Sequence, residues 1–484
     1  MSVRTRRPHW LGFLLMGAAL AAPADAEPPP EGSCPALTAQ PGASVGEDAV
    51  LTRIPEGATV AYDSLLALRH LLPEEVWQLR HAFFHDGMRL EIGACHRRYP
   101  TAEFYAQATE QFLGKAKLDA DGNLHGYVAG LPFPPATIDP QAPDAATRWA
   151  WNLEKRFRGA GPTGKFRLVD FPSRMGGVMT YEGSFFLLQS RERADLAATG
   201  YAIPNADESL WISGGRFDEP ADARQLAWNQ IRSPEAETQY TNADQTFVYV
   251  PSMRKVRRSA TPWVDGLFTP RYRLSGDSGG GGIAIGGSDY GSTESINPTA
   301  AVSTQVSEYL RRGFATLSLR PNAYVWRLLG EREVLAPINS SHDGYPTNRE
   351  RNYGTSGLSV ASDRWDMRQA VVIEGLARFR DQFKTLTVYV DYQTQQPLYL
   401  VRRGERGRII DVGIAVHRFS GDVGGYPVFG DGITANVFDP VAEVFYVMAD
   451  ESGWRRESWG VKSTPTADTV QRRFTSTDFL MRGH

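Results

Sequence analysis

A serine in a glycine-rich setting is the first feature of this sequence that could do chemistry. Residues 276–280 read GDSGG, which matches the nucleophile loop of chymotrypsin-like proteases. That chemistry needs a histidine base on an upstream strand and an aspartate that orients it. No histidine lies between Lys165 and Ser278, and the loop lacks the Gly-Lys-Ser/Thr ending of a phosphate-binding loop. The glycine run at 275–292 therefore favours a flexible insertion over a protease site.

A histidine pair and several carboxylates are the other groups that could be reactive. His81 and His85 lie four residues apart, a spacing that places two side chains on one helix face, but no glutamate of a zinc-protease pattern accompanies them. The sequence therefore predicts neither a metal site nor a cofactor. Glycoside hydrolysis would need two carboxylates at a defined separation, and the sequence places no pair of them. The carboxylates considered are Asp363, Asp366, Asp391, Asp411 and Asp439.

A basic run follows an aromatic strand in the stretch 245–262, QTFVYVPSMRKVRRSATP. Alternation places Phe247 and Tyr249 on one face of the strand, and Pro251 ends the ladder because it has no N–H to donate. The cations could contact acidic lipid head groups or a partner's carboxylate. The alternative is a charged edge that discourages strand pairing. The four cations are Arg254, Lys255, Arg257 and Arg258.

The N-terminus has the pattern of a cleavable export signal at residues 1–26. A basic start is followed by an apolar core, Leu11 to Ala22, and by the small-x-small site Ala24-Asp25-Ala26. Cleavage would remove three arginines and one acid from the 52 basic and 55 acidic residues, which leaves 49 and 54. This acidic balance argues against a nucleic-acid partner. Because of the signal, the mature chain is expected to begin near Glu27 and to leave the cytoplasm, as a soluble or peripheral protein.

The two cysteines, Cys34 and Cys95, could form a disulfide in an oxidising compartment and tether the mature N-terminus. Two buried free thiols are the alternative. The sequence leaves both readings open.

The elements that would position these groups are expected to be mainly helices in the first part of the chain and mainly strands in the rest. After an extended leader at 27–47, a helix-rich part is expected over 48–164, with helices at 62–72, 73–86, 101–117 and 145–157. A β body with short aromatic or β-branched strands then runs from 165 to 484. Because few helices separate these strands, we expect antiparallel meander pairing. The expected strands are 166–171, 178–188, 209–214, 245–250, 315–319, 323–330, 370–379, 385–392, 397–403 and 408–419.

Several stretches together resemble the family called domain of unknown function 1329, whose members are exported proteins of Gram-negative bacteria. The stretches are GLPFPP at 130–135, Trp151-Asn152 with RFRG at 156–159, FVYVPSMRKVRRSATP at 247–262, YVWRLLGEREVLAP at 324–337 and TLTVYVDYQTQQPLYLV at 385–401.

The resemblance implies a fold and a class of function. The fold would be α+β but mainly β: a large curved antiparallel sheet, an unclosed barrel similar to LolA/LolB-type lipoprotein carriers, with helices packed on or in its concave side. The function would be non-enzymatic binding or carriage of an apolar small molecule or lipid in the periplasm, with outer-membrane association as an option. The protein would act with a transporter of the resistance-nodulation-division (RND) type and a 1302-family partner, or in delivery to the outer membrane. Aromatic candidates to line the ligand site are Trp211, Phe247, Tyr249, Tyr324 and Trp326.

Two other functions stay open at this point. One is a secreted hydrolase acting on an ester or a glycan, for which Ser278 or the carboxylates would be needed. The other is an envelope interaction scaffold that binds no ligand. An apolar cavity inside the sheet would favour the carrier over the scaffold.

Overall fold

The computed structural model describes most of the chain between residues 29 and 463. The described ranges are 29–34, 36–38, 51–53, 56–171, 178–204, 209–251, 254–259, 265–273, 282–284, 313–344, 351–378, 383–423, 435–448 and 451–463. The expected signal at 1–26, the serine of the GDSGG motif and most of the glycine-rich insertion lie outside them. Within the described ranges, no helix is long and apolar enough to cross a membrane.

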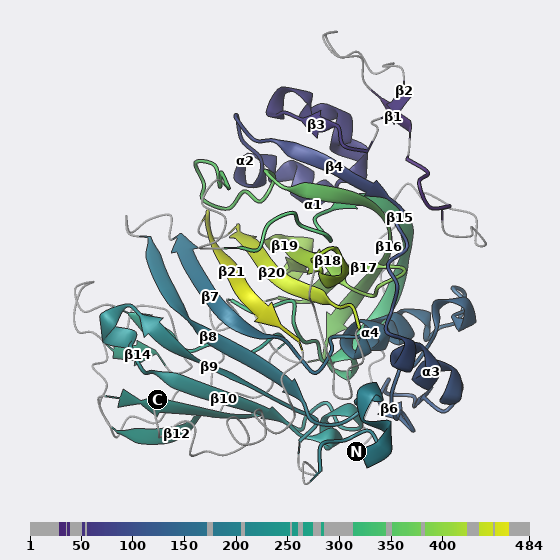
Figure 1. The fold of residues 1–484 in the computed structure, drawn as a ribbon, viewed down its shortest axis with the longest axis vertical. Helices are drawn as coiled ribbons and strands as arrows, with labels where there is room; N and C mark the ends of the chain where they lie inside the picture. Colours follow the sequence, from purple (N-terminus) through teal and green to yellow (C-terminus); the bar gives the residue numbers. More distant parts are fainter. Residues whose placement is uncertain are drawn as a thin grey trace, which may run out of the picture.

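One large sheet of 15 strands dominates the fold (Figure 1). It is mainly antiparallel and not closed into a barrel, as the sequence predicts. From edge to edge the order is β12 (Lys255–Ser259), β11 (Gln245–Val250), β10 (Ala227–Arg232), β9 (Trp211–Glu219), β8 (Met179–Gln189), β7 (Thr163–Phe171), β21 (Ser452–Lys462), β20 (Phe438–Val447), β19 (Ile409–Phe419), β18 (Pro397–Arg403), β17 (Thr385–Asp391), β16 (Arg364–Ala377), β4 (Leu90–Cys95) and β3 (Thr59–Val60), and β15 (Tyr324–Ala336) pairs with β16.

The sheet consists of two meanders that meet where β7 pairs with β21. One meander runs outward from β7 to β12, and the other runs from β15 to β21. Every pair within them is antiparallel, as expected for strands joined by short turns. The exception to the expected pattern is the parallel pair of β16 with β4, a strand from the N-terminal part of the chain.

Helices cover the sheet on both sides. The predicted segment 62–72 forms the 3₁₀ helix η1 (Tyr62–Leu71), and 73–86 forms two shorter helices, α1 (Glu74–Gln78) and α2 (Arg80–Phe83). The other two predicted helices are α3 (Glu103–Gln111) and α4 (Ala145–Lys155).

The described chain also has short elements outside the large sheet and the predicted helices. Three are two-stranded sheets: β1 (Ala36–Thr38) with β2 (Leu51–Arg53), β5 (Lys117–Leu118) with β6 (Leu124–His125), and β13 (Arg271–Arg273) with β14 (Gly282–Ala284). The others are the 3₁₀ turns η2 (Pro135–Thr137), η3 (Ala194–Thr199), η4 (Ala221–Ala223), η5 (Pro234–Glu237), η8 (Pro321–Ala323), η9 (Glu405–Gly407) and η10 (Ser420–Asp422).

The strand prediction is wrong for residues 315–319, which are buried but adopt no strand. The alternating sequence Ala-Thr-Leu-Ser-Leu has strand character, but carboxylates and arginines from other elements take up its backbone groups, as described below. The sequence analysis did not predict six strands of the large sheet, β3, β4, β10, β12, β20 and β21, or the six strands of the small two-stranded sheets. Among these, β20 and β21 carry buried charged residues, which break the apolar alternation expected of a strand.

The strands from β16 to β20 are buried on both faces. We call the face that packs against α4 the inner face. Its apolar cluster contains residues of β7 to β11 and of β15 to β21, among them Val388, Leu400 and Phe445. The opposite, outer face packs against η1, α1 and α2 and carries residues such as Tyr399 and Val444. Figure 1 shows the sheet curving from β12 round to β15, with α1 and α2 on one side and α4 on the other.

A disulfide joins Cys34 to Cys95 at the end of β4. The backbone N–H of Gly32 also donates to the carbonyl of Cys95 at 2.8 Å. Together these bonds tie the N-terminal segment to the edge of the sheet.

Candidate ligand site on the inner face of the sheet

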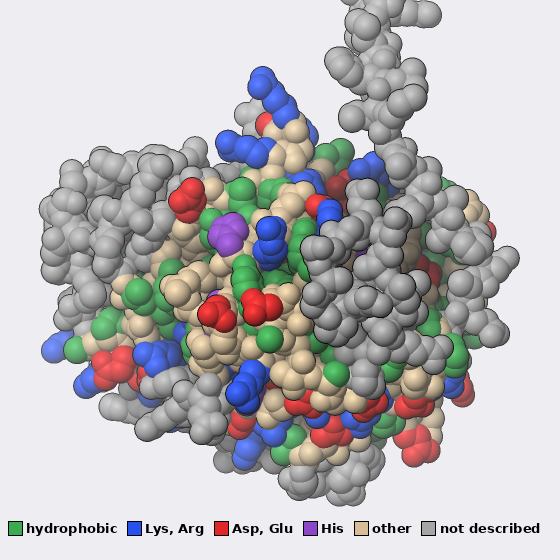
Figure 2. All heavy atoms as spheres, turned by 90° about the horizontal axis from the view of Figure 1, so that it is seen from above, with side chains coloured by type: hydrophobic (Ala, Val, Ile, Leu, Met, Phe, Trp, Pro, Cys, Tyr) green, Lys and Arg blue, Asp and Glu red, His purple; other side chains and the backbone are tan. Residues whose placement is uncertain are grey.

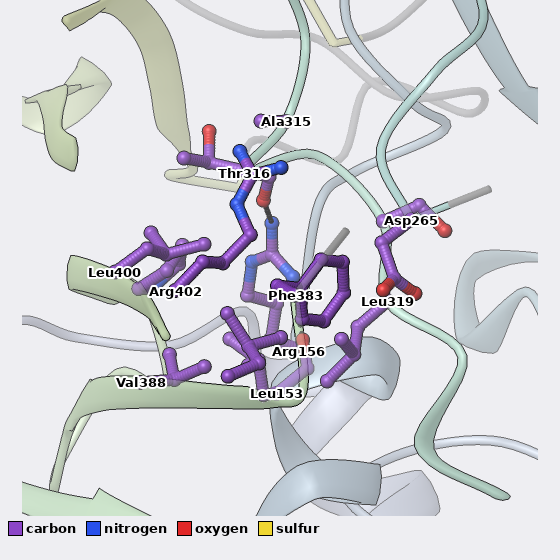
Figure 3. A pocket seen from close by; sticks show the side chains of 13 residues that line it. Leu153, Arg156, Asp265, Ala315, Thr316, Leu319, Phe383, Val388, Leu400 and Arg402 are labelled. Carbon is purple, nitrogen blue, oxygen red and sulfur yellow. Dashed lines mark hydrogen bonds between the residues drawn. The ribbon is translucent and has the colours of Figure 1, made fainter. Parts of the chain in front are cut away.

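A small, mainly apolar cavity lies between α4, the strands β17 and β18, and a segment that crosses the inner face. Its volume is about 30 Å³, room for roughly two water-sized groups. In Figure 3 the Arg156 and Arg402 side chains point toward the crossing segment at Ala315 and Thr316. The lining residues are Leu153, Arg156, Asp265, Ala315, Thr316, Ser318, Leu319, Phe383, Leu386, Val388, Pro397, Leu400 and Arg402.

We call the crossing segment, residues 313–320, the inner strap. It is buried along its whole length, yet it does not pair with a strand of the large sheet. Its backbone bonds run instead to a neighbouring loop: the N–H of Gly266 donates to Ser318 O at 2.7 Å and that of Leu267 to Phe314 O at 3.0 Å. The Phe314 ring packs against the Phe185 ring with centroids 4.7 Å apart. Tertiary contacts, rather than strand pairing, therefore hold the strap.

Two buried glutamates accept the hydrogen bonds of the strap. Glu443 of β20 accepts from the N–H of Ala315 at 2.9 Å and from the N–H and hydroxyl of Thr316 at 3.0 and 2.7 Å. Glu154 of α4 accepts from the N–H of Leu319 at 2.7 Å. Backbone N–H groups buried away from water need such partners, so the glutamates do for the strap what a neighbouring strand would otherwise do.

Two arginines just after α4 bind the carbonyls of the strap. Arg156 donates from Nη2 to Thr316 O at 3.0 Å and from Nε to Gln396 Oε1 at 3.0 Å, and a third bond goes to the carbonyl of Leu153. Arg158 donates to Leu317 O. The segment 156–159, quoted above as a family marker, therefore fastens α4 to the strap.

Arg156 differs electrostatically from the other buried arginines near the cavity. Among the described residues, no carboxylate lies at ion-pair distance from it, and its hydrogen-bond acceptors are two carbonyls and an amide. Burial, reinforced by the neighbouring charge of Arg158, lowers the pKa of Arg156 to about 9. A guanidinium has five N–H donors, and three are used here.

The neighbouring arginines each have a carboxylate partner. Arg402 lies 3.0 Å from Asp411, and Arg456 lies 3.4 Å from Glu443. Further along the strap, Arg232 and Arg320 share Asp244. These pairs balance charge inside the fold and leave Arg156 as the exception.

His417 of β19 is the other unusual buried group on this side. Its side chain is buried, and within the described part of the chain its Nδ1 has no hydrogen-bond partner. Burial lowers its pKa to about 3, with further contributions from Arg156 and Arg456. The imidazole is therefore neutral in the folded protein, and protonation would add charge to a site that already holds excess positive charge.

The five aromatic residues proposed for the ligand site lie on different faces, and none of them lines the cavity. Trp211, Tyr324 and Trp326 belong to the inner apolar cluster. Tyr324 donates its hydroxyl proton to Asp265, a residue of the cavity wall. Phe247 and Tyr249 are half-buried on the side of β11 opposite the buried Thr246 and Val248.

The predicted basic run lies at the edge of the sheet. Among the described strands, β12 pairs with β11 alone, and the side chains of Arg254, Lys255 and Arg258 are exposed. The side chain of Arg257 lies outside the described residues. On the face seen in Figure 2, basic and acidic side chains of the described residues are interspersed.

The groups considered for catalysis have structural partners. Asp363 pairs with Arg351, Asp391 with Arg368 and Asp411 with Arg402. Asp366 accepts from the hydroxyl of Tyr99, and Asp439 accepts from that of Ser463. His85 bonds to backbone carbonyls, and His81 packs against the ring of Tyr446. Among the described residues, no three His, Cys, Asp or Glu side chains are grouped to hold a metal ion.

A second, wider groove of about 430 Å³ lies between α3, β5 and the start of α4. It shares no lining residue with the inner cavity, and its walls mix apolar and charged side chains such as Leu113, Phe133, Lys117 and Arg148.

Sequence reasoning missed Arg156, Glu154 and Glu443 as residues of the inner site. The first two had a signal, because a glutamate and an arginine follow the apolar residues Trp149, Trp151 and Leu153 in a helix that is buried along most of its length. Charged side chains are seldom fully buried unless they have a role. Glu443 carried no such signal, since β20 itself was not predicted.

The fold is thus a mainly antiparallel, unclosed sheet with helices on both faces and a buried polar strap on the inner face. The model of the family described as "Protein of unknown function (DUF1329)" matches residues 69–274 and 314–457. The chain belongs to this family, as its sequence resemblance predicts. A search of curated proteins found no match.

Several solved structures are similar to this chain, including the following two. A DUF1329 family protein from Desulfovibrio piger is 12% identical, with 66% of this chain and 92% of that chain covered and a TM-score of 0.36. A LolA superfamily protein from Nitrosomonas europaea is 12% identical, with 69% and 97% covered and a TM-score of 0.32.

Proposed function

We propose that this protein is a non-enzymatic binding protein of the bacterial envelope that carries a lipophilic molecule on the inner face of its sheet. The observation that supports it most directly is the composition of the inner cavity. Its wall is built mainly from apolar side chains, among them Leu153, Phe383, Val388 and Leu400, with a small number of polar groups. Ligand sites for small apolar molecules have this composition.

Binding of a whole lipid needs more room than the cavity offers. Its volume of about 30 Å³ is far below the roughly 300–1,000 Å³ of sites that enclose a ligand. The inner strap is the part of the wall that can separate without breaking sheet pairing, since its bonds go to side chains and to one loop. A bound chain would thus take the place of the strap against the inner apolar cluster, which includes Trp211, Tyr324 and Trp326.

The first test is chemical extraction. The protein would be purified from the periplasm without detergent, extracted with organic solvent and compared by mass spectrometry with an unrelated periplasmic protein. We expect a co-purifying apolar molecule in near-stoichiometric amount. Absence of such a molecule, together with no binding of a hydrophobic fluorescent dye, would contradict the proposal.

A cavity-filling variant localises the site. Leu400→Trp places a large ring in the inner cavity and should reduce dye binding about tenfold or more, because the ring occupies the space that a ligand needs. Leu329→Trp is the matched control, because Leu329 is 47% exposed on β15. Equal loss of binding in both variants would place the site elsewhere, and the wide groove beside α3 would be tested next.

The envelope setting and the partners are further parts of this proposal. An export signal at 1–26 supports the periplasm, and the family resemblance supports an RND-type transporter and a 1302-family protein as partners. Cross-linking in intact cells followed by mass spectrometry would identify these partners. Recovery of cytoplasmic proteins alone would contradict the setting.

A further inference from the structure

The charges around the inner strap do not balance. Among the described residues, the connected network that contacts the strap or lines the cavity holds six arginines and five carboxylates. All of them are buried. The arginines are Arg156, Arg158, Arg232, Arg320, Arg402 and Arg456, and the carboxylates are Glu154, Asp244, Asp265, Asp411 and Glu443.

Among the described residues, Arg156 is the arginine of this network that has no ion pair, although the charge of Glu154 also acts on it. Arg158 has Glu154 at 3.9 Å. Four further arginines of the network each have a carboxylate within 3.5 Å: Arg232, Arg320, Arg402 and Arg456. Arg156 alone relies on neutral acceptors, with Gln396 and Thr316 each at 3.0 Å. A buried ion without a counterion is costly, and proteins normally pair such groups.

Arg156 also faces open space, since it is one of the residues that line the cavity. Two of its five N–H donors have no acceptor in the bonds described above. A guanidinium binds carboxylate and phosphate groups through paired N–H donors. The cavity of about 30 Å³ offers roughly two water-sized positions, which is comparable to the two oxygens of a carboxylate.

We propose that the carried molecule is an amphiphile with an anionic head group, a carboxylate or a phosphate, which binds Arg156 while its apolar part packs on the inner face. This inference rests on the proposed carrier function and adds the chemical class of the ligand. The head group would supply the missing negative charge of the network. The apolar wall residues Leu153, Val388 and Leu400 would contact the first atoms of the chain.

The test compares ligands that differ only in the head group. Oleic acid, oleyl alcohol and oleoyl lysophosphatidic acid would displace a bound fluorescent dye from the wild-type protein. A charge-assisted hydrogen-bonded pair predicts that at least one acid binds about tenfold or more tighter than the alcohol. The stronger of the two acids identifies the head group as carboxylate or phosphate.

Two variants then assign the preference to Arg156. In Arg156→Gln the ratio of acid to alcohol affinity should fall to about one, since the charge that distinguishes the two ligands is gone. Arg158→Gln is the matched control: it also loses a bond to a strap carbonyl, but its arginine has a carboxylate neighbour and does not line the cavity. Its ratio should stay at the wild-type value, whatever happens to the individual affinities.

The outcomes separate this inference from the function on which it rests. Equal binding of acids and alcohol by the wild-type protein would overturn the anionic head group and leave the carrier function standing. No binding of any of the three ligands would overturn both. If Arg156→Gln does not fold, Arg156→Lys and the wild-type comparison still test the anionic head group. The lysine variant keeps the positive charge, so it should keep most of the preference for the acids over the alcohol.

Discussion

The two buried faces of the strands β16 to β20 differ in how their buried charges are arranged. The outer face packs apolar side chains such as Tyr399, Val412 and Val444 against η1, α1 and α2, and its buried Arg368 is paired with Asp391. The inner face adds a network of buried charges and an irregular strap to its apolar side chains. Apolar packing stabilises a fold with little specificity for what it contacts, whereas buried charges are costly unless each finds a partner. The difference is that the outer-face arginine Arg368 has its carboxylate, whereas the inner face includes Arg156, whose hydrogen-bond acceptors are all neutral.

The largest effect should come from breaking an inner-face pair. Glu443→Ala leaves Arg456 buried without its partner and removes three acceptor bonds of the strap. We expect the free energy of unfolding to fall by about 3–5 kcal/mol. Ile414→Val on the outer face should cost only about 0.5–1.5 kcal/mol. Denaturant unfolding of both variants checks this, and similar losses would mean that the two faces do not differ in this way.

The disulfide tests how the outer side is secured. The double variant Cys34→Ala with Cys95→Ala removes a cross-link over 61 residues and should lower the free energy of unfolding by about 2–4 kcal/mol. Wild-type protein unfolded under reducing conditions should show the same loss. If reduction has no effect on the unfolding midpoint, the tether does not contribute to global stability.

The inner face should also respond to acid through His417. Its pKa is about 3 in the folded protein, against about 6.5 when unfolded, so the unfolded state binds the extra proton as the pH falls below 6.5. Stability should decrease by up to about 1.4 kcal/mol per pH unit between these values. His417→Gln should remove that contribution, and His81→Gln, at an exposed position, should not. The measurement is the free energy of unfolding at pH 6.5 and 5.5. If it changes with pH in the His417 variant as much as in the wild type, His417 is not the cause of the pH dependence.

The smallest effect is expected at the sheet edge, which belongs to neither face. Lys255→Gln and Arg258→Gln change exposed side chains of β12 and should alter the free energy of unfolding by less than about 0.5 kcal/mol each. If the charges guard the edge against pairing, the double variant should self-associate more, as light scattering would show. Weaker membrane binding without self-association would instead favour a head-group contact.

Much of the fold was predictable because local patterns carry it. The strands of 385–419 alternate and are separated by short turns, and they form β17, β18 and β19 as expected. The four predicted helices also appear, although the first is 3₁₀ and the second is divided at Leu79. In these segments the apolar period and the turn residues agree with the tertiary contacts.

The inner site was less predictable because its parts are distant in sequence. Thr316 has the local pattern of a strand residue, but Glu443, 127 residues away, accepts its N–H. Arg156 was visible only as part of a family marker, since its lack of a carboxylate partner is a property of the assembled interior. No local rule reports which charges a buried residue will meet.

By itself, the sequence determined the mainly antiparallel sheet, the helices that precede it and the family, because periodicity and turn chemistry act over a few residues. Only the tertiary structure decided that residues 313–320 form a strap rather than a strand, and that Arg156 faces a cavity without a counterion. The physical reason is that burial and charge pairing are set by groups that the fold brings together, and for Arg156 these come from α4, the strap and the loop after β17.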